Sequence, residues 1–144
     1  MRLLIFALIS LLICVLDIRI LKIPNILLLL LLGFLAFFDR NESFEILINQ
    51  ALAAIIGFTI FLLIFHFVGG LGFGDVKYIA VIGFALGLEK LVLAFLLIAF
   101  EGIIAYYIGV CFLKLEKRTK MPFAPFLASG SVLAYVIPNP LSGF

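Results

Sequence analysis

Charged and turn-forming residues divide the chain into six apolar segments. A helix that spans a bilayer needs about 20 apolar residues. The third and fifth segments reach this length, the second and sixth approach it, and the first and fourth are short, although the first can extend through Asp17 toward Ile20. The pattern predicts six helices, at Leu3–Leu16, Pro24–Phe38, Ile46–Val68, Val76–Leu88, Leu91–Leu113 and Pro122–Pro138.

A glycine-rich stretch precedes the fourth segment. Four of the six residues from Gly69 to Gly74 are glycine, and Asp75 and Lys77 follow them. Glycine breaks helices and allows another chain to approach closely. A broken backbone at membrane depth is tolerated only where protein or a water-filled notch covers it. The sequence therefore predicts a glycine-rich break before a short fourth helix.

The composition is typical of a protein that lies in a lipid bilayer. Of 144 residues 67% are hydrophobic, 12% are charged, and the mean hydropathy is +1.42. A soluble domain of this length cannot bury so much apolar surface. We expect one all-α integral membrane domain over residues 1–144. The net charge of +2 gives no indication of nucleic-acid binding. Cys14 and Cys111 lack a Cys-x-x-Cys partner, so no metal or cofactor is expected.

Loop charge predicts the orientation. If six helices cross the membrane alternately, the loops after the first, third and fifth lie on one side and carry seven of the ten lysines and arginines. The positive-inside rule places these loops in the cytoplasm and both termini outside. Asp17 ends the first helix and Asp75 begins the fourth, so both carboxylates are expected at the cytoplasmic face.

Each polar residue near these boundaries also has a plainer interpretation. Asp17 can belong to an ordinary interfacial loop, and the glycines before Asp75 to a flexible linker rather than an edge for an incoming peptide. Lys77 either favours the charged form of Asp75, orients a substrate carbonyl or extends toward lipid headgroups. His66 has no second ligand nearby, which favours a packed or interfacial role.

Glu101 lies near the middle of the fifth segment. An ionisable group at that depth normally faces the bundle interior and is paired. Its expected partner is a hydroxyl group, and a role in a proton path stays open. The candidate hydroxyl groups belong to Ser10, Thr59 and Tyr106.

Three blocks, in this order, resemble the signature of the type IV prepilin peptidases, which are Gly-x-Gly-Asp intramembrane aspartyl proteases. They are Asp17 followed by Ile23-Pro24-Asn25, then Gly-Phe-Gly-Asp-Val-Lys at 72–77, then Pro-Phe-Ala-Pro-Phe-Leu at 122–127. The resemblance implies that Asp17 and Asp75 are catalytic. The supporting or substrate-binding residues that it implies are Gly72, Gly74, Lys77, Pro24 and Asn25.

The resemblance also implies prepilin-like precursors as substrates, cut at the cytoplasmic face of the cell membrane. The chain resembles the short, peptidase-only form, for which no methyltransferase activity is expected. Leu16 stands where presenilin-type proteases have a tyrosine. One alternative is a small proton-coupled transporter that uses Asp17, Asp75 and Glu101, although no internal repeat is found. The other is a non-catalytic membrane scaffold, which leaves two carboxylates at one face unexplained.

Overall fold

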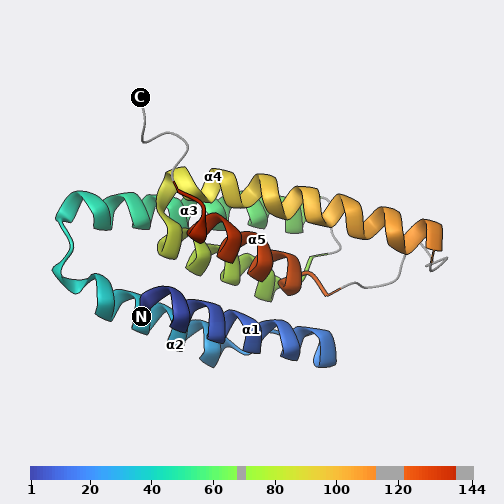
Figure 1. Cartoon of the computed structure of the whole chain (residues 1–144), viewed down its shortest axis with the longest axis horizontal. Helices are drawn as coiled ribbons and strands as arrows, with labels where there is room; N and C mark the ends of the chain where they lie inside the picture. Colours follow the sequence, from blue (N-terminus) through green and yellow to red (C-terminus); the bar gives the residue numbers. More distant parts are fainter. Residues whose placement is uncertain (68–70, 113–121, 139–144) are drawn as a thin grey trace.

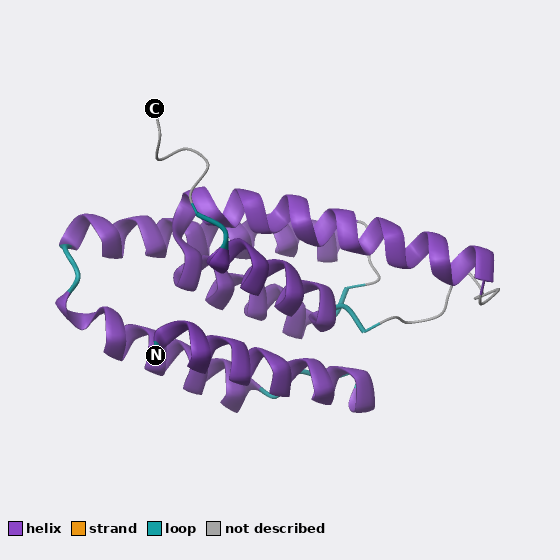
Figure 2. Ribbon diagram, in the orientation of Figure 1, coloured by secondary structure: helices purple, strands orange, loops and turns teal. Residues whose placement is uncertain are grey.

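The computed structural model describes residues 1–67, 71–112 and 122–138, and all regular structure in this part of the chain is helical (Figure 2). The predicted helices are therefore confirmed as helices in the described residues. The beginning of the glycine run, at 68–70, and the basic loop at 113–121 lie outside them. The elements are α1 (Arg2–Ile20), α2 (Asn25–Phe38), the 3-10 turn η1 (Asp39–Asn41), α3 (Phe44–Phe67), α4 (Phe73–Phe112) and α5 (Ala124–Val136).

Helix α4 consists of two arms that meet at Gly87. Gly87 has φ 75° and ψ 175°, in the region that favours glycine. The break frees the N–H of Leu88, which donates to Oδ1 of Asn49 in α3 at 3.0 Å. Figure 1 shows the first arm (yellow-green) running to this break and the second arm (yellow to orange) running back. The sequence placed the boundary between Leu88 and Leu91, and the break lies just before it, at Gly87.

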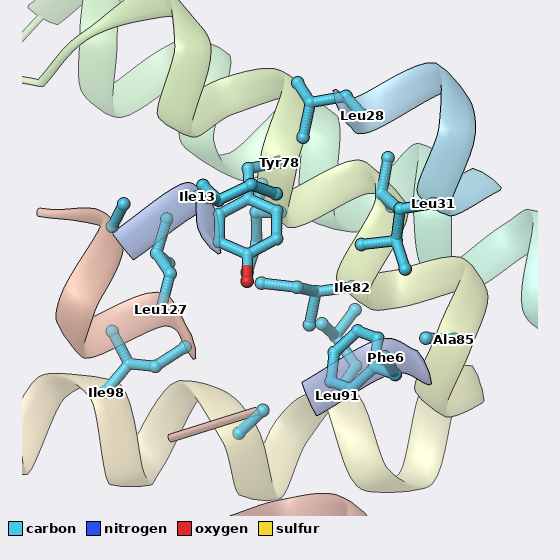
Figure 3. Close-up of a cluster of buried hydrophobic side chains, with 14 of the residues drawn as sticks. Phe6, Ile13, Leu28, Leu31, Tyr78, Ile82, Ala85, Leu91, Ile98 and Leu127 are labelled. Atoms are coloured by element: carbon cyan, nitrogen blue, oxygen red, sulfur yellow. The ribbon is translucent and has the colours of Figure 1, made fainter. Parts of the chain in front are cut away.

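The short first arm of α4 lies in the interior of the bundle. Its Gly83 lies against Ala53 of α3, and its Lys77 bonds to Asn25 of α2. Val76, Tyr78, Ile79 and Ile82 are all fully buried. In Figure 3 the Tyr78 ring lies among side chains from α1, α2, the second arm and α5. Other helices therefore cover the arm that is too short to span a bilayer by itself.

Glycine allows the closest helix contact. A Cβ built on Gly83 of α4 would lie 2.6 Å from the carbonyl oxygen of Ala53 in α3, whereas one on Gly33 of α2 meets nothing within 4 Å. Overpacking costs about 1–3 kcal/mol, whereas glycine to alanine in an open helix gains up to about 1 kcal/mol. We expect Gly83→Ala to lower the unfolding midpoint in detergent and the matched Gly33→Ala to leave it equal or higher. Equal midpoints for both variants would contradict the close contact.

A charged cluster joins the helix ends opposite to the glycine-rich stretch. The guanidinium group of Arg2 forms a 2.9 Å ion pair with Asp39 and donates to the carbonyl oxygen of Ala85 at 2.9 Å. It also reaches the Tyr135 hydroxyl group at 3.3 Å. The side-chain amide of Gln50 donates to Asp39 at 3.1 Å. This Arg2–Asp39 cluster links all five α-helices at one end of the bundle.

The outer surface is apolar, as a membrane protein requires. Helices α1 and α3 and the stretch Phe73–Ile108 of α4 are long and apolar enough to cross a membrane. Large side chains such as Leu29 (65% exposed) and Phe100 (64% exposed) point outward. The chain is therefore a multi-pass membrane protein by architecture, with its interior and its exterior both apolar.

Candidate active site

Asp17 lies in the last turn of α1 and is buried. The extension of the first helix through Asp17 to Ile20, which the sequence allowed, is confirmed, so Asp17 lies one turn before the end of the helix. The helix closes at Leu21, whose left-handed φ of 50° directs the chain toward α2. The carboxylate Oδ2 of Asp17 accepts a hydrogen bond of 3.1 Å from the backbone N–H of Ala124, the first residue of α5.

The beginning of α5 is built to present this N–H group. The first N–H groups of a helix have no partner inside the helix, and the helix dipole attracts a carboxylate there. Pro122 and Pro125 have no N–H, so Phe123 and Ala124 supply the backbone donors of this four-residue stretch. From the sequence, this stretch was identified only as part of the third signature block, and its contact with Asp17 was not predicted. The available signal was the pair of prolines around two N–H groups.

Asp75 is the third residue of α4 and is also buried. Its Oδ2 accepts from the N–H of Gly72 at 3.0 Å, and its own N–H donates to the Gly72 carbonyl oxygen at 3.0 Å. This reciprocal pair is the arrangement by which an acidic third residue caps a helix. The other oxygen, Oδ1, is buried and has no hydrogen-bond partner in the described residues. A buried oxygen without a partner is unusual and requires an explanation.

The two glycines of the Gly-x-Gly-Asp block leave space for this carboxylate and for the neighbouring loop. A Cβ on Gly72 would lie 3.3 Å from Oδ2 of Asp75. A Cβ on Gly74 would lie 3.0 Å from the Cβ of Ile23, in the loop between α1 and α2. Larger residues would therefore push Asp75 aside or separate the loop from α4.

Asp17 and Asp75 line one cavity of about 430 Å³. Pro24, in an extended conformation, precedes α2 and brings Asn25 to the cavity wall. The cavity is lined by Asp17, Leu21, Lys22, Ile23, Asn25, Leu71, Gly72, Phe73, Gly74, Asp75 and Phe123.

Lys77 stands beside the cavity rather than in its lining. Its ammonium group donates to Oδ1 of Asn25 at 3.0 Å and lies 5.0 Å from the centre of the Phe73 ring. No contact between Lys77 and either aspartate is found among the described residues. Lys77 therefore connects the first turn of α4, which carries Asp75, to the first turn of α2.

Two other polar residues lie away from this cavity. Glu101 accepts a hydrogen bond from the hydroxyl group of Ser129 in α5, which was not among the partners considered from the sequence. The ring of His66 lies 5.1 Å from that of Phe67. Within residues 1–67, 71–112 and 122–138, no group of three His, Cys, Asp or Glu side chains is placed to hold a metal ion.

Comparison with known proteins gives two matches. Residues 4–109 match the model of the type IV leader peptidase family. A protein of Bacillus subtilis (strain 168) named prepilin leader peptidase/N-methyltransferase is 35% identical over 141 residues, which cover 97% of this chain. The chain spans 57% of the length of that relative. No solved structure matches.

Proposed function

The chain belongs to the type IV leader peptidase family, and from this membership we propose that it is an aspartic endopeptidase that cuts the leader from prepilin-like precursors. The observation that carries the proposal is the cavity that Asp17 and Asp75 share. These residues are 58 positions apart in the sequence and come from different helices. The one buried carboxylate oxygen without a partner, among the described aspartate oxygens, belongs to this pair.

Two adjacent carboxylates hydrolyse a peptide by activating a water molecule between them. Because like charges at close range disfavour joint ionisation, the pair holds one proton. The ionised carboxylate takes a proton from water as the water attacks the scissile carbonyl carbon. The protonated carboxyl group gives its proton to the carbonyl oxygen, and the pair then protonates the departing amine. The proton belongs to the pair, so neither aspartate is assigned one role.

The surrounding backbone holds the pair in place. One oxygen of each carboxylate is bound to a backbone N–H, from Ala124 for Asp17 and from Gly72 for Asp75. Oδ1 of Asp75 has no such bond and is the atom that we expect to contact water or the scissile carbonyl oxygen. Backbone donors are rigid, which preserves the geometry that proton transfer requires.

The transporter alternative finds no support in this geometry. It requires Asp17, Asp75 and Glu101 to form one relay, yet Glu101 does not line the cavity of the aspartates and pairs with Ser129. The membrane face of the active site follows from loop charge. If the helices cross the membrane alternately, the loops on the side of Asp17 and Asp75 carry seven of the ten lysines and arginines, which favours the cytoplasmic face.

The function is tested by incubating the purified chain in detergent or vesicles with a prepilin precursor. We expect leader release, detected as a mobility shift and as a new N-terminus by mass spectrometry. Inhibition by a metal chelator would contradict the proposed mechanism, because the carboxylate pair works without a metal. A known prepilin peptidase acting on its own prepilin serves as the positive control. If this chain leaves its precursor intact at the enzyme concentration at which the control is cleaved, the proposed activity is refuted.

Lys77 and Asn25 are expected to act as one positioning unit. Removing their hydrogen bond loosens α4 against α2, and such bonds contribute about 0.5–1.5 kcal/mol. We expect Lys77→Met and Asn25→Ala each to lower kcat by about three- to tenfold. The double variant should lose little more than either single variant, because coupled residues are not additive. Multiplicative losses in this cycle would show that Lys77 acts without Asn25.

A further inference from the structure

A carboxyl group and a hydroxyl group interrupt the apolar outer face of α4 and α5. Ser129 is exposed, and its hydroxyl group donates to Glu101 on the second arm of α4. Nearby outward side chains are apolar, among them Ile104 (43% exposed) and Leu133 (47% exposed). Glu101 is half-buried, and an ionisable group within a membrane-spanning helix is costly and normally has a functional reason.

The hydrogen bonds of this pair leave it able to bind a further group. The Ser129 oxygen also lies 2.8 Å from the carbonyl oxygen of Pro125 and 3.4 Å from that of Phe126, so its single hydrogen has three possible acceptors. Only Oε2 of Glu101 takes part in a contact within the described residues. Glu101 is half-buried, so its carboxyl group retains accepting capacity that a donor from outside can reach.

This polar pair lies on a stripe that begins at the cavity. Phe126, Ser129, Leu133 and Val136 follow one another at spacings of three, four and three, which places them on one side of a helix. We call these four residues the α5 face. The Phe126 ring lies 6.0 Å from the ring of Phe123, which lines the cavity. At 1.5 Å per residue, Ser129 lies about 9 Å along the axis from Phe123.

We propose that the α5 face, together with Glu101, binds an apolar membrane helix of the substrate while the adjoining scissile bond occupies the cavity. This inference rests on the proposed peptidase function. A chain that leaves the cavity along α5 enters hydrocarbon, where its backbone must be helical to satisfy its own hydrogen bonds. We expect the substrate helix to carry a hydrogen-bond donor about one and a half turns from the scissile bond, at the level of Glu101.

Continuity with the cavity favours a substrate helix over a second copy of this chain. A second copy would have no reason to occupy a stripe that begins beside the aspartates. Interhelical hydrogen bonds and close packing are what drive helix association in lipid, and the α5 face offers both. Contact between the α5 face and the substrate helix therefore sets the affinity for the precursor, whereas the aspartates carry out the chemical step.

The kinetic test compares a full precursor with a short peptide that spans the scissile bond and lacks the apolar segment. In Glu101→Leu and Ser129→Ala, we expect the ratio of kcat/KM for the precursor to kcat/KM for the peptide to fall about tenfold and about threefold, mainly through KM. Glu101→Gln, which keeps an accepting oxygen, should change the ratio less than threefold. Thr59→Val is the matched control, because Thr59 is an exposed hydroxyl residue of α3 bonded to its own helix.

The outcomes separate this inference from the proposed function. If the ratio of the two kcat/KM values stays unchanged, whether both values fall equally or neither falls, the α5 face is not a binding site for the substrate helix. The proposed peptidase function is unaffected by this outcome. Wild-type chain that cleaves neither substrate would refute the function itself. If the wild type cleaves the precursor but not the peptide, the inference is supported. The KM for the precursor is then compared between the wild type and the variants.

Cross-linking identifies the occupant directly. With Cys14 and Cys111 replaced by alanine, Leu133→Cys is labelled with a photoreactive maleimide, and Ile55→Cys on the exposed surface of α3 serves as its control. We expect a product with the apolar segment of the precursor from position 133 and none from position 55. A homodimer product from position 133 in place of a precursor product would overturn the proposal in favour of a second copy.

Discussion

Replacing either aspartate of the cavity by asparagine is expected to lower leader cleavage by about 10³-fold or more. An amide cannot take up or release the proton that the carboxylate pair exchanges with water and the scissile bond. Each variant should still fold, because an asparagine oxygen can accept the N–H of Ala124 in place of Asp17, or that of Gly72 in place of Asp75. Activity is measured as the initial rate of leader release.

A matched control and a stability measurement complete this experiment. Glu45→Gln changes an exposed carboxylate at the beginning of α3 and should keep full activity. The unfolding midpoints of the asparagine variants in detergent should stay close to that of the wild type. Full activity of Asp17→Asn or of Asp75→Asn would end the proposal of a carboxylate pair.

Removing the carboxylate of the Arg2–Asp39 cluster is expected to reduce stability instead. Asp39 is 2% exposed and is bound to both Arg2 and Gln50. Removing one partner of a buried ion pair typically costs about 3–5 kcal/mol. Arg2 retains partial access to water, so we expect about 2–4 kcal/mol for Asp39→Leu, measured as unfolding in denaturant-containing detergent.

The double variant tests whether the lost charge pair is the cause. Replacing both members of a buried ion pair by apolar residues is often close to neutral. Arg2→Met combined with Asp39→Leu should therefore be more stable than Asp39→Leu alone. Glu42→Ala, an exposed carboxylate next to η1, should change stability by less than about 0.5 kcal/mol. A double variant that is less stable than Asp39→Leu would show that Arg2 is held by its other contacts.

Together these two experiments assign different tasks to the two ends of the bundle. The cavity end is predicted to lose catalysis without losing stability. The Arg2–Asp39 cluster at the other end is predicted to lose stability first and activity only as a consequence. Buried carboxylates occur at both ends, so burial alone does not distinguish a catalytic aspartate from a structural one. The distinction lies in the surroundings: Asp39 forms an ion pair with a guanidinium group, whereas Asp75 lines a cavity together with another carboxylate.

Much of the local structure followed from the sequence by itself. Charged and turn-forming residues indicated where the helices begin and end. A charge in the middle of the membrane is costly, and a backbone break at membrane depth must be covered by protein or water. This logic predicted a short fourth helix that ends at Leu88, one residue beyond the break that the structure has at Gly87. It also selected Asp17, Asp75 and the flanking glycines as one group, and the structure places them around one cavity.

The sequence could not determine which side of each helix faces inward. In α2, Leu28 and Leu31 are buried whereas Leu29 and Leu30 face outward, and all four are leucine. In water, polarity would separate the two sides of a helix, but lipid is as apolar as a protein core. The partners of polar atoms were also decided in the tertiary structure. The N–H of Ala124 reaches Asp17 across 107 residues, a distance over which no local pattern carries information. The chain thus specifies its helices and its chemistry by local physics, and only packing decides which of those groups meet.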